Sequence, residues 1–301
     1  MSHPNLKRLR RTMMFLSAQK PGLIKDAYIY QPDSLIFDLE DAVAENQKDA
    51  ARFSLYHALR TVDYHGVERL VRINGLDTPH WREDIRVSVA AGADGIRIAK
   101  CETPEDIATV VEAVLAAEKE YHRPAGETLL MAALESPLAV LNSYAICQAC
   151  PERLFGIALS GGDFRRCMQT NYTPGGIEML GGRAHILMAA RAAGIQCFDT
   201  VFTDLDDMEG FEAEVLQNKQ MGFDGKSIIS PKQIGIVHRV FTPDRKEIQT
   251  AEKIVRAVRE NAESGIGIFT VDGKMVDIAF LPGAERIIAL AKASGIYEGD
   301  F

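Results

Sequence analysis

Short apolar runs recur eight times along the first 240 residues, and each is followed by a polar turn and a longer segment with helical spacing of its apolar residues. A short apolar run between turn residues is typical of a strand buried on both faces of a sheet. Strands that alternate with helices build a parallel sheet from βαβ units. The predicted strands comprise residues 12–16, 34–37, 70–73, 96–99, 129–134, 154–159, 195–198 and 225–229.

Eight strand–helix units in about 240 residues match a closed (β/α)₈ barrel, the TIM barrel of the α/β class. The alternative is an open, doubly wound sheet, which usually carries a glycine-rich turn after its first strand. The corresponding segment here is Leu16-Ser17-Ala18-Gln19, which has no glycine. The sequence therefore favours the barrel.

The pattern changes after Phe241. An amphipathic helix over 246–264 is followed by alternating apolar and polar residues over 265–276, centred on Asp272-Gly273, a turn typical of a β-hairpin. A last helix is predicted over 282–293. We therefore predict a barrel domain over 1–241 and a C-terminal extension over 242–301. The extension is too short to fold alone, and we predict that it acts as a lid.

Composition limits the possible classes of function. The chain has 301 residues, 47% of them hydrophobic, and a net charge of −8, which argues against nucleic-acid binding. No apolar segment is long enough to span a membrane, and the N-terminus does not resemble a signal peptide. Five scattered cysteines fit a reducing compartment, so we expect a cytoplasmic protein. Cys147 and Cys150 lack the second ligand pair of a zinc site.

Charged side chains stand where the predicted strands end. Because the carboxyl ends of parallel strands meet at one rim of a barrel, these charges should gather there. Carboxylates are hard ligands for Mg²⁺, and cations suit an anionic substrate. The pattern predicts Mg²⁺-assisted chemistry on a carboxylate-bearing substrate. The charged residues are Asp38, Glu40, Asp41, Arg72, Lys100, Glu135, Asp163, Asp199 and Lys226.

Several of these residues also have structural interpretations. Asp41 suits a helix N-cap, and Asp199 could simply brace the rim. Glu135 has no capping role because Ser136 takes that position, which favours a functional role. Lys100 fits an ion pair or a substrate contact equally well. Arg72 lies between two apolar residues of a buried strand, which is costly unless its charge is paired, and this favours carboxylate binding.

The motifs as a set resemble the citrate lyase β-subunit family of HpcH/HpaI aldolases, whose wider group includes malyl-CoA and citramalyl-CoA lyases. The resemblance extends over nearly the whole chain. Its motifs are FDLEDAV (37–43), VRIN (71–74), LESP (134–137), FDTV (198–201), GFDGKS (222–227), SPKQI (230–234) and DGKMVD (272–277).

The resemblance implies a Mg²⁺-dependent barrel that cleaves a β-hydroxyacyl thioester by a retro-aldol step. By motif, Glu135 and Asp163 are the metal ligands and Arg72 binds a substrate carboxylate. Asp277, from the tail motif, reaches a neighbouring subunit's site and exchanges the proton. We thus assign catalysis to Asp277, Arg72 and Asp38, substrate binding to Arg72, Glu135 and Lys100, and metal binding to Glu135 and Asp163.

The implied substrate is a citryl group on an acyl-carrier protein, which gives oxaloacetate and the acetyl carrier. The implied partners are the α and γ subunits of citrate lyase and further copies of the chain, as a trimer or a hexamer of trimers. Two alternatives stay open. One is a lyase for CoA thioesters of malyl, citramalyl or citryl groups, and the other is a non-catalytic assembly subunit. We expect no nucleic-acid or membrane partner.

Overall fold

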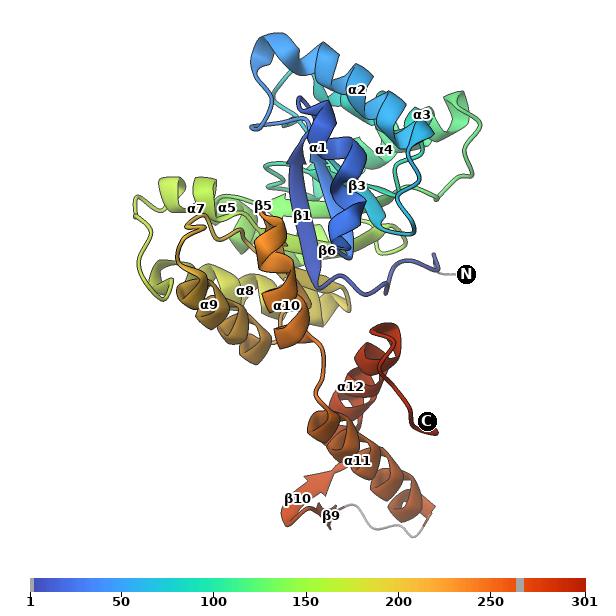
Figure 1. Cartoon of the computed structure of the whole chain (residues 1–301), viewed down its shortest axis with the longest axis vertical. Coiled ribbons are helices and arrows are strands. Elements are labelled where there is room, and N and C mark those ends of the chain that lie inside the picture. Colours follow the sequence, from blue (N-terminus) through green and yellow to red (C-terminus); the bar gives the residue numbers. More distant parts are fainter. Residues whose placement is uncertain (1–2, 264–267) are drawn as a thin grey trace. The chain divides into compact units, whose positions relative to one another are not determined.

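The computed structural model describes residues 3–263 and 268–301. It divides into two compact units, Met1–His238 and Arg239–Phe301, which we call the barrel unit and the C-terminal unit. The boundary falls within helix α10 (Ile234–Phe241), close to the end of the predicted barrel domain. In Figure 1 the barrel unit runs from blue to orange, and the C-terminal unit is orange to red.

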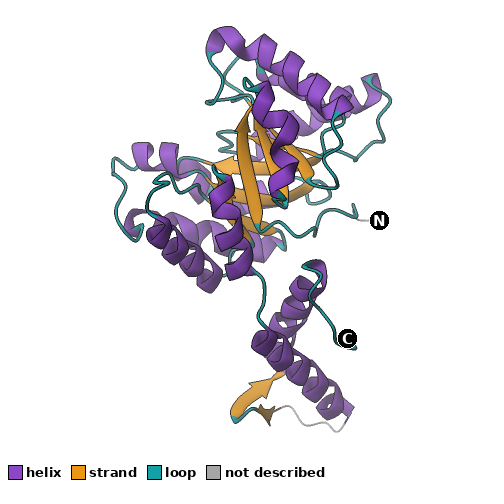
Figure 2. Cartoon of the chain, viewed as in Figure 1, coloured by secondary structure: helices purple, strands orange, loops and turns teal. Residues whose placement is uncertain are grey.

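Eight parallel strands close into a barrel in which each pairs with the next and β1 pairs with β8, so the predicted TIM barrel is confirmed. Figure 2 shows the strands in the interior with helices around them. Every residue of β5 and β6 is buried, as their apolar runs predict. The strands are β1 (Thr12–Ser17), β2 (Ser34–Asp38), β3 (Glu68–Ile73), β4 (Gly95–Ile98), β5 (Leu129–Leu134), β6 (Leu154–Leu159), β7 (Gln196–Asp199) and β8 (Gly225–Ile228).

The predicted helices follow the strands. Thr103 and Asp106, whose spacing in the sequence suits a capping box, form one at the start of α4, and Ser136 caps α5 by accepting the N–H of Ala139. The helices are α1 (Pro21–Asp26), α2 (Lys48–Thr61), α3 (Trp81–Ala91), α4 (Pro104–Glu120), α5 (Pro137–Leu141), α6 (Ser143–Gln148), α7 (Gly161–Cys167), α8 (Ile177–Ala193), α9 (Met208–Met221) and α10, with 3₁₀ turns η1 (Ala27–Tyr30), η2 (Glu45–Gln47) and η3 (Pro231–Gln233).

Two helices differ from the sequence prediction. Residues 42–59 have helical spacing and no proline or glycine, which predicts a helix from residue 42. Helix α2 instead begins at Lys48, because the Lys48 ammonium binds the carbonyl oxygens of Leu39 and Glu40 and holds the preceding segment as a loop. The sequence after Ser136 also predicts one helix to about residue 150. In the structure this segment is divided into α5 and α6 at Asn142, whose side chain donates to the Glu102 carbonyl. Both differences arise from polar contacts between segments that periodicity does not reveal.

The N-terminal end of the barrel is closed by a buried polar cluster over an apolar core. Arg10 forms hydrogen bonds with both carboxylate oxygens of Glu68, and Ser34 donates to the same carboxylate. The Arg10 guanidinium lies 3.8 Å from the ring centre of Phe155, which belongs to the core cluster inside the barrel. A ligand therefore has to enter from the opposite end.

A second buried ionic cluster fastens α8 and α9 to β7 and β8. Asp199 forms a two-bond ion pair with Arg183 and also accepts hydrogen bonds from Lys226 and Asn218. Glu214 pairs with both cations. Although burial raises the pKa of Asp199, the charges of Lys226 and Arg183 outweigh it and hold the pKa below its usual value. Asp199 and Lys226 thus neutralise each other at the end of the barrel.

The C-terminal unit is a helix pair with a small hairpin. Its elements are α11 (Arg245–Glu263), β9 (Ile268–Val271), β10 (Lys274–Asp277), η4 (Ile278–Phe280) and α12 (Leu281–Ala293). The predicted hairpin forms, with Asp272 and Gly273 both at positive φ in its turn, although 265–267 lie outside the described residues. Ala251, Val255, Ala284 and Ile288 form the core between the helices. The lid role of this unit stays a prediction.

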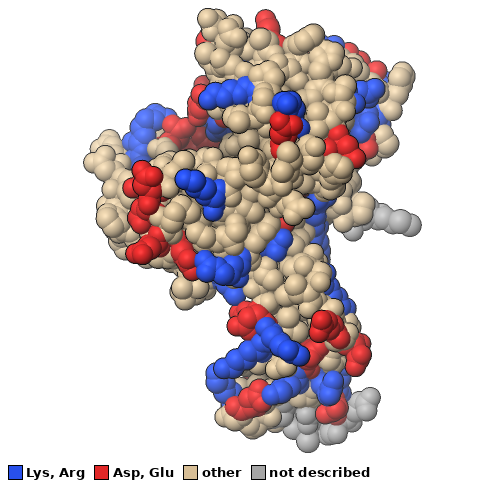
Figure 3. Space-filling view, viewed as in Figure 1, with Lys and Arg blue, Asp and Glu red and all other residues tan. Residues whose placement is uncertain are grey.

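We next consider whether any described helix could cross a membrane and how charge is distributed on the surface. None of the helices in residues 3–263 and 268–301 is long and apolar enough to cross a membrane. On the face drawn in Figure 3, Lys and Arg side chains alternate with Asp and Glu rather than gathering in one basic patch.

We predict that Asp199→Asn lowers the free energy of unfolding by about 3–5 kcal/mol, because it leaves Arg183 and Lys226 buried with Glu214 as their single carboxylate partner. Urea denaturation measures this change. The control is Glu120→Gln, which breaks the exposed pair with Arg86 and should cost no more than about 1 kcal/mol. Equal losses in the two variants would contradict this account.

Candidate active site

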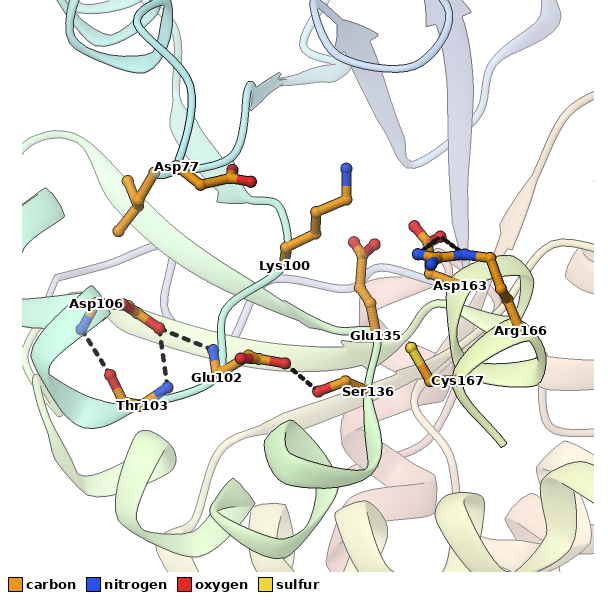
Figure 4. Close-up of a pocket in the computed structure, with 11 residues that line it drawn as sticks. Asp77, Lys100, Glu102, Thr103, Asp106, Glu135, Ser136, Asp163, Arg166 and Cys167 are labelled. Carbon is orange, nitrogen blue, oxygen red and sulfur yellow. Dashed lines mark hydrogen bonds and ion pairs between the residues drawn. The ribbon is translucent and has the colours of Figure 1, made fainter. Parts of the chain in front are cut away.

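Two adjoining cavities of about 380 and 400 Å³ lie where the strands of the barrel end. We call the first the lysine cavity, because Lys100 lines it, and the second the arginine cavity, because Arg72 and Arg97 line it. Glu135 and Asp163 line both. Figure 4 shows the lysine cavity, with the Glu135 side chain between Lys100 and Asp163. The carboxylate pair therefore belongs to the wall shared by the two cavities.

Glu135 and Asp163 form a close pair of carboxyl groups. Glu135 directly follows β5 and is 4% exposed, and its Oε1 atom has no hydrogen-bond partner. Burial, the Glu40 charge and a hydrogen bond with Asp163 raise the pKa of Glu135 to about 7, against the opposing effect of Arg72. Two carboxyl groups this close hold either a shared proton or a cation.

Asp163 is the more accessible member of the pair. It stands in the first turn of α7, and its Oδ1 accepts two hydrogen bonds from Arg166, at 3.0 and 2.6 Å. Although burial raises its pKa, the bonds with Arg166 and Glu135 lower it overall. Asp163 thus stays ionised and faces the cavities.

Arg72 is held by two carboxylates at the end of β2. The Arg72 Nε and Nη2 atoms both donate hydrogen bonds to the Asp38 carboxylate. Glu40 Oε2 lies 2.8 Å from Arg72 Nη1. Asp38 also accepts the backbone N–H groups of Glu40 and Ala42, which fixes its position. Although burial alone would lower the pKa of Arg72, these carboxylates raise it. A guanidinium has five N–H donors, so hydrogens on Nη1 and Nη2 are left to face the cavity.

Lys100 pairs with Glu40 at the other side of the same loop. Its Nζ lies 2.5 Å from Glu40 Oε1, and its backbone adopts a left-handed conformation at φ 51°. Burial raises the pKa of Glu40 in spite of Arg72 and Lys100. Lys100 therefore forms an ion pair and also lines a cavity, while its contact with a substrate stays a prediction.

Sequence reasoning missed Arg97. This residue is on β4, is 2% exposed, and lines the arginine cavity beside Arg72. It lies between Ile96 and Ile98, as Arg72 lies between Val71 and Ile73, so the same signal was present in the sequence. The β3–β4 register places Arg72 and Arg97 directly opposite each other.

The remaining predicted residues are divided. Asp41 lines the arginine cavity, where it is mostly exposed and 3.8 Å from Arg72. Asp199 and Lys226 instead belong to the ionic cluster under α8 and α9. Asp277 is in the C-terminal unit, at the end of β10, where its carboxylate accepts the N–H of Ala279. The charges at the strand ends are thus divided between a structural cluster and the cavity walls.

The cavity residues fit a divalent cation. Among residues 3–263 and 268–301 no group of three or more His, Cys, Asp or Glu side chains is arranged to hold a metal ion. Mg²⁺, however, commonly takes one or two protein carboxylates and completes its shell with water and substrate oxygens. The free Oε1 atom of Glu135, beside Asp163, is the kind of oxygen ligand that such a site requires.

Two sequence profiles match the chain. Residues 11–231 match the HpcH/HpaI aldolase/citrate lyase family, and residues 180–296 match a family described as a C–C bond lyase of the TIM-barrel fold. The two matches overlap, and the first covers the whole cavity wall described above. Both descriptions concern the cleavage or formation of carbon–carbon bonds.

Individual relatives agree with the profiles. The chain is 47% identical over 296 residues to citrate lyase subunit beta from Leuconostoc mesenteroides subsp. cremoris, covering 98% of each. It is 35% identical over 283 residues to (3S)-malyl-CoA thioesterase from Cereibacter sphaeroides, covering 94% of this chain and 95% of that protein. CitE from Mycobacterium tuberculosis, solved with magnesium, acetoacetate and coenzyme A, has a TM-score of 0.75 and 26% identity over 94% of this chain and 98% of that one.

We predict that Mg²⁺ stabilises the native chain and that Glu135→Gln and Asp163→Asn each abolish this effect. At a tenfold excess over the dissociation constant, binding adds about 1.4 kcal/mol. Thermal unfolding with and without Mg²⁺ measures it. Asp77→Asn is the matched control, because Asp77 lines the lysine cavity but is exposed. A response to Mg²⁺ that survives both substitutions would place the cation elsewhere.

Proposed function

Because the chain belongs to the HpcH/HpaI aldolase/citrate lyase family, we propose that it cleaves a citryl thioester to oxaloacetate and an acetyl thioester. The chain is a carbon–carbon lyase that uses Mg²⁺. One observation carries the proposal for the site: the buried Glu135 and the partly exposed Asp163 line the same cavity as the buried Arg97 and the mostly buried Arg72. The pair suits the cation, and the arginines suit the carboxylates of the acyl group.

Glu135 and Asp163 would hold the cation. When bound, Mg²⁺ polarises the hydroxyl group of the substrate and stabilises the keto acid that forms. Arg72 then orients the substrate by binding one of its carboxylates through the Nη hydrogens that Asp38 leaves available. Asp38 acts as a positioning residue, because its two bonds and its backbone contacts prevent Arg72 from turning. This fixes the bond to be broken before the reaction begins.

For the carbon–carbon bond to break, the substrate hydroxyl must lose its proton, and the carbon next to the thioester carbonyl, which keeps the electron pair, must then accept one. We assign both transfers to Asp277 of the C-terminal unit: its carboxylate takes the hydroxyl proton and returns a proton to that carbon. An acid–base group that joins the site after the substrate is compatible with a lid, because closure excludes water while the enolate exists. Asp277 is half-buried and caps η4 in the C-terminal unit, so its carboxylate has a defined position there.

A malyl thioester is the second candidate substrate. The relative named (3S)-malyl-CoA thioesterase, at 35% identity over nearly the whole chain, favours it. That name implies hydrolysis, whereas the family description names an aldolase and a lyase. The products separate the possibilities, since a lyase releases a keto acid and a thioesterase releases a free thiol.

The larger assembly is also part of the proposal. The name subunit beta of a relative at 47% identity supports an assembly of several subunits, so we propose α and γ citrate lyase subunits and an acyl-carrier protein as partners, with CoA as the alternative carrier. We further propose a homo-oligomer, a trimer or a hexamer of trimers, in the cytoplasm. The five cysteines are all free, as in a reducing compartment.

We predict that the purified chain with Mg²⁺ releases oxaloacetate from a citryl thioester, and that Arg72→Met lowers kcat/KM about 10²–10³-fold through lost positioning and charge stabilisation. The assay follows keto-acid release from citryl, malyl and citramalyl thioesters on CoA and on the carrier protein. Arg69→Met is the matched control, since Arg69 is on the same strand but pairs with Asp94 away from both cavities. No cleavage of any thioester would support a non-catalytic assembly subunit.

We also predict that Asp277→Asn and Arg72→Met, each strongly impaired alone, regain activity when the two variants are refolded together. Mixed oligomers would contain sites with an intact Arg72 from one copy and an intact Asp277 from another. The regained activity should approach a quarter of that of the native chain. Two outcomes contradict this assignment: a mixture that stays inactive, and an Asp277→Asn variant with full activity.

A further inference from the structure

Arg97 differs from the other buried arginines of the barrel unit. In the part of the chain that the structure describes, Arg10, Arg52, Arg153 and Arg183 each form an ion pair with a buried carboxylate. Arg97 has no such pair: Nη2 donates to Ser160 Oγ at 3.1 Å, Nη1 approaches the Met131 sulfur at 3.8 Å, and Nε has no hydrogen-bond partner. An unpaired buried charge is costly, so its persistence requires an explanation.

The position of Arg97 points to a ligand. Arg97 and Arg72 are opposite each other on neighbouring strands, and each guanidinium lies 5.1 Å from the ring centre of Phe15. Both line the cavity that also contains Glu135 and Asp163. Burial and the Arg72 charge lower the pKa of Arg97 to about 10, so it is still a cation at neutral pH.

We propose that Arg97 binds a second carboxylate of the acyl group, so that the site selects thioesters whose acyl group carries two free carboxylates over those that carry one. This inference rests on the proposed function of the same cavity. A citryl thioester has two free carboxylates, whereas malyl and citramalyl thioesters have one. With Arg72 for the first carboxylate and Arg97 for the second, the two charges of a citryl group are both matched. A substrate with one carboxylate leaves Arg97 unpaired, which costs binding energy.

Binding and stability together test this role. In the presence of Mg²⁺, calorimetry compares oxaloacetate, which keeps both carboxylates, with pyruvate, which keeps one. We expect Arg97→Met to weaken oxaloacetate binding about 10–100-fold and to leave pyruvate binding within about twofold. Arg97→Lys should retain part of the affinity for oxaloacetate. The same variants should lower kcat/KM for the citryl thioester much more than for the malyl thioester.

Stability separates a binding role from a structural role. Without ligand, Arg97→Met should unfold at a temperature no lower than the native chain, because it removes an unpaired buried charge. Arg10→Met is the matched control, since Arg10 is equally buried but paired with Glu68, and its loss should lower the unfolding temperature. A large drop for Arg97→Met, or failure of that variant and Arg97→Lys to fold, would overturn the inference.

The two proposals fail in different ways. If the native chain prefers oxaloacetate to pyruvate through Arg97 but cleaves no thioester, the inference stands and the lyase function is wrong. If the native chain cleaves the citryl thioester and Arg97→Met keeps the same preference for citryl over malyl, the lyase function stands and the role of Arg97 is wrong. Equal loss of oxaloacetate and pyruvate binding also contradicts the inference.

Discussion

The site depends on incomplete pairing of buried charge at the carboxyl ends of the barrel strands. Most ionised groups there neutralise one another, because an unpaired charge in a closed barrel is costly. Two of the buried atoms without a hydrogen-bond partner in the described chain, Arg97 Nε and Glu135 Oε1, belong to residues that line one cavity. The Arg97 guanidinium needs an anion, and the Glu135 carboxylate needs a cation or a proton. In the complex that we propose, a substrate carboxylate meets the first need and Mg²⁺ meets the second.

How completely a buried charge is paired distinguishes the charges that can bind a ligand from those that stabilise the fold. Asp199 ends β7 and Lys226 is opposite it near the start of β8, yet Arg183 and Glu214 complete their pairing, which leaves them no role toward a ligand. Arg72 is intermediate, because Asp38 and Glu40 hold it in place but do not use all its donors. Preorganisation of this kind means that a ligand meets an arginine already in position.

Much of the architecture could be predicted from the sequence, because short apolar runs and helical spacing report burial directly. The eight strands, the capping box at Thr103 and the hairpin at Asp272-Gly273 all follow local patterns. The convergence of Glu135 and Asp163 on one cavity wall followed from strand order alone. The division of a helix at Asn142 and the late start of α2 could not be predicted, since both depend on contacts with distant loops. Arg97 was missed although its pattern matches that of Arg72; its importance appears only when its lack of a carboxylate partner is known.

The most direct test of the central claim is to locate the cation in the native chain. In crystals grown with Mn²⁺ in place of Mg²⁺ and with oxaloacetate, anomalous scattering gives the metal position independently of any assay. The account predicts one peak at a bonding distance of about 2.1 Å from carboxylate oxygens of both Glu135 and Asp163, with oxaloacetate between the peak and Arg72. If the enzyme is active with Mn²⁺ and the peak lies next to neither carboxylate, the account of the site is contradicted.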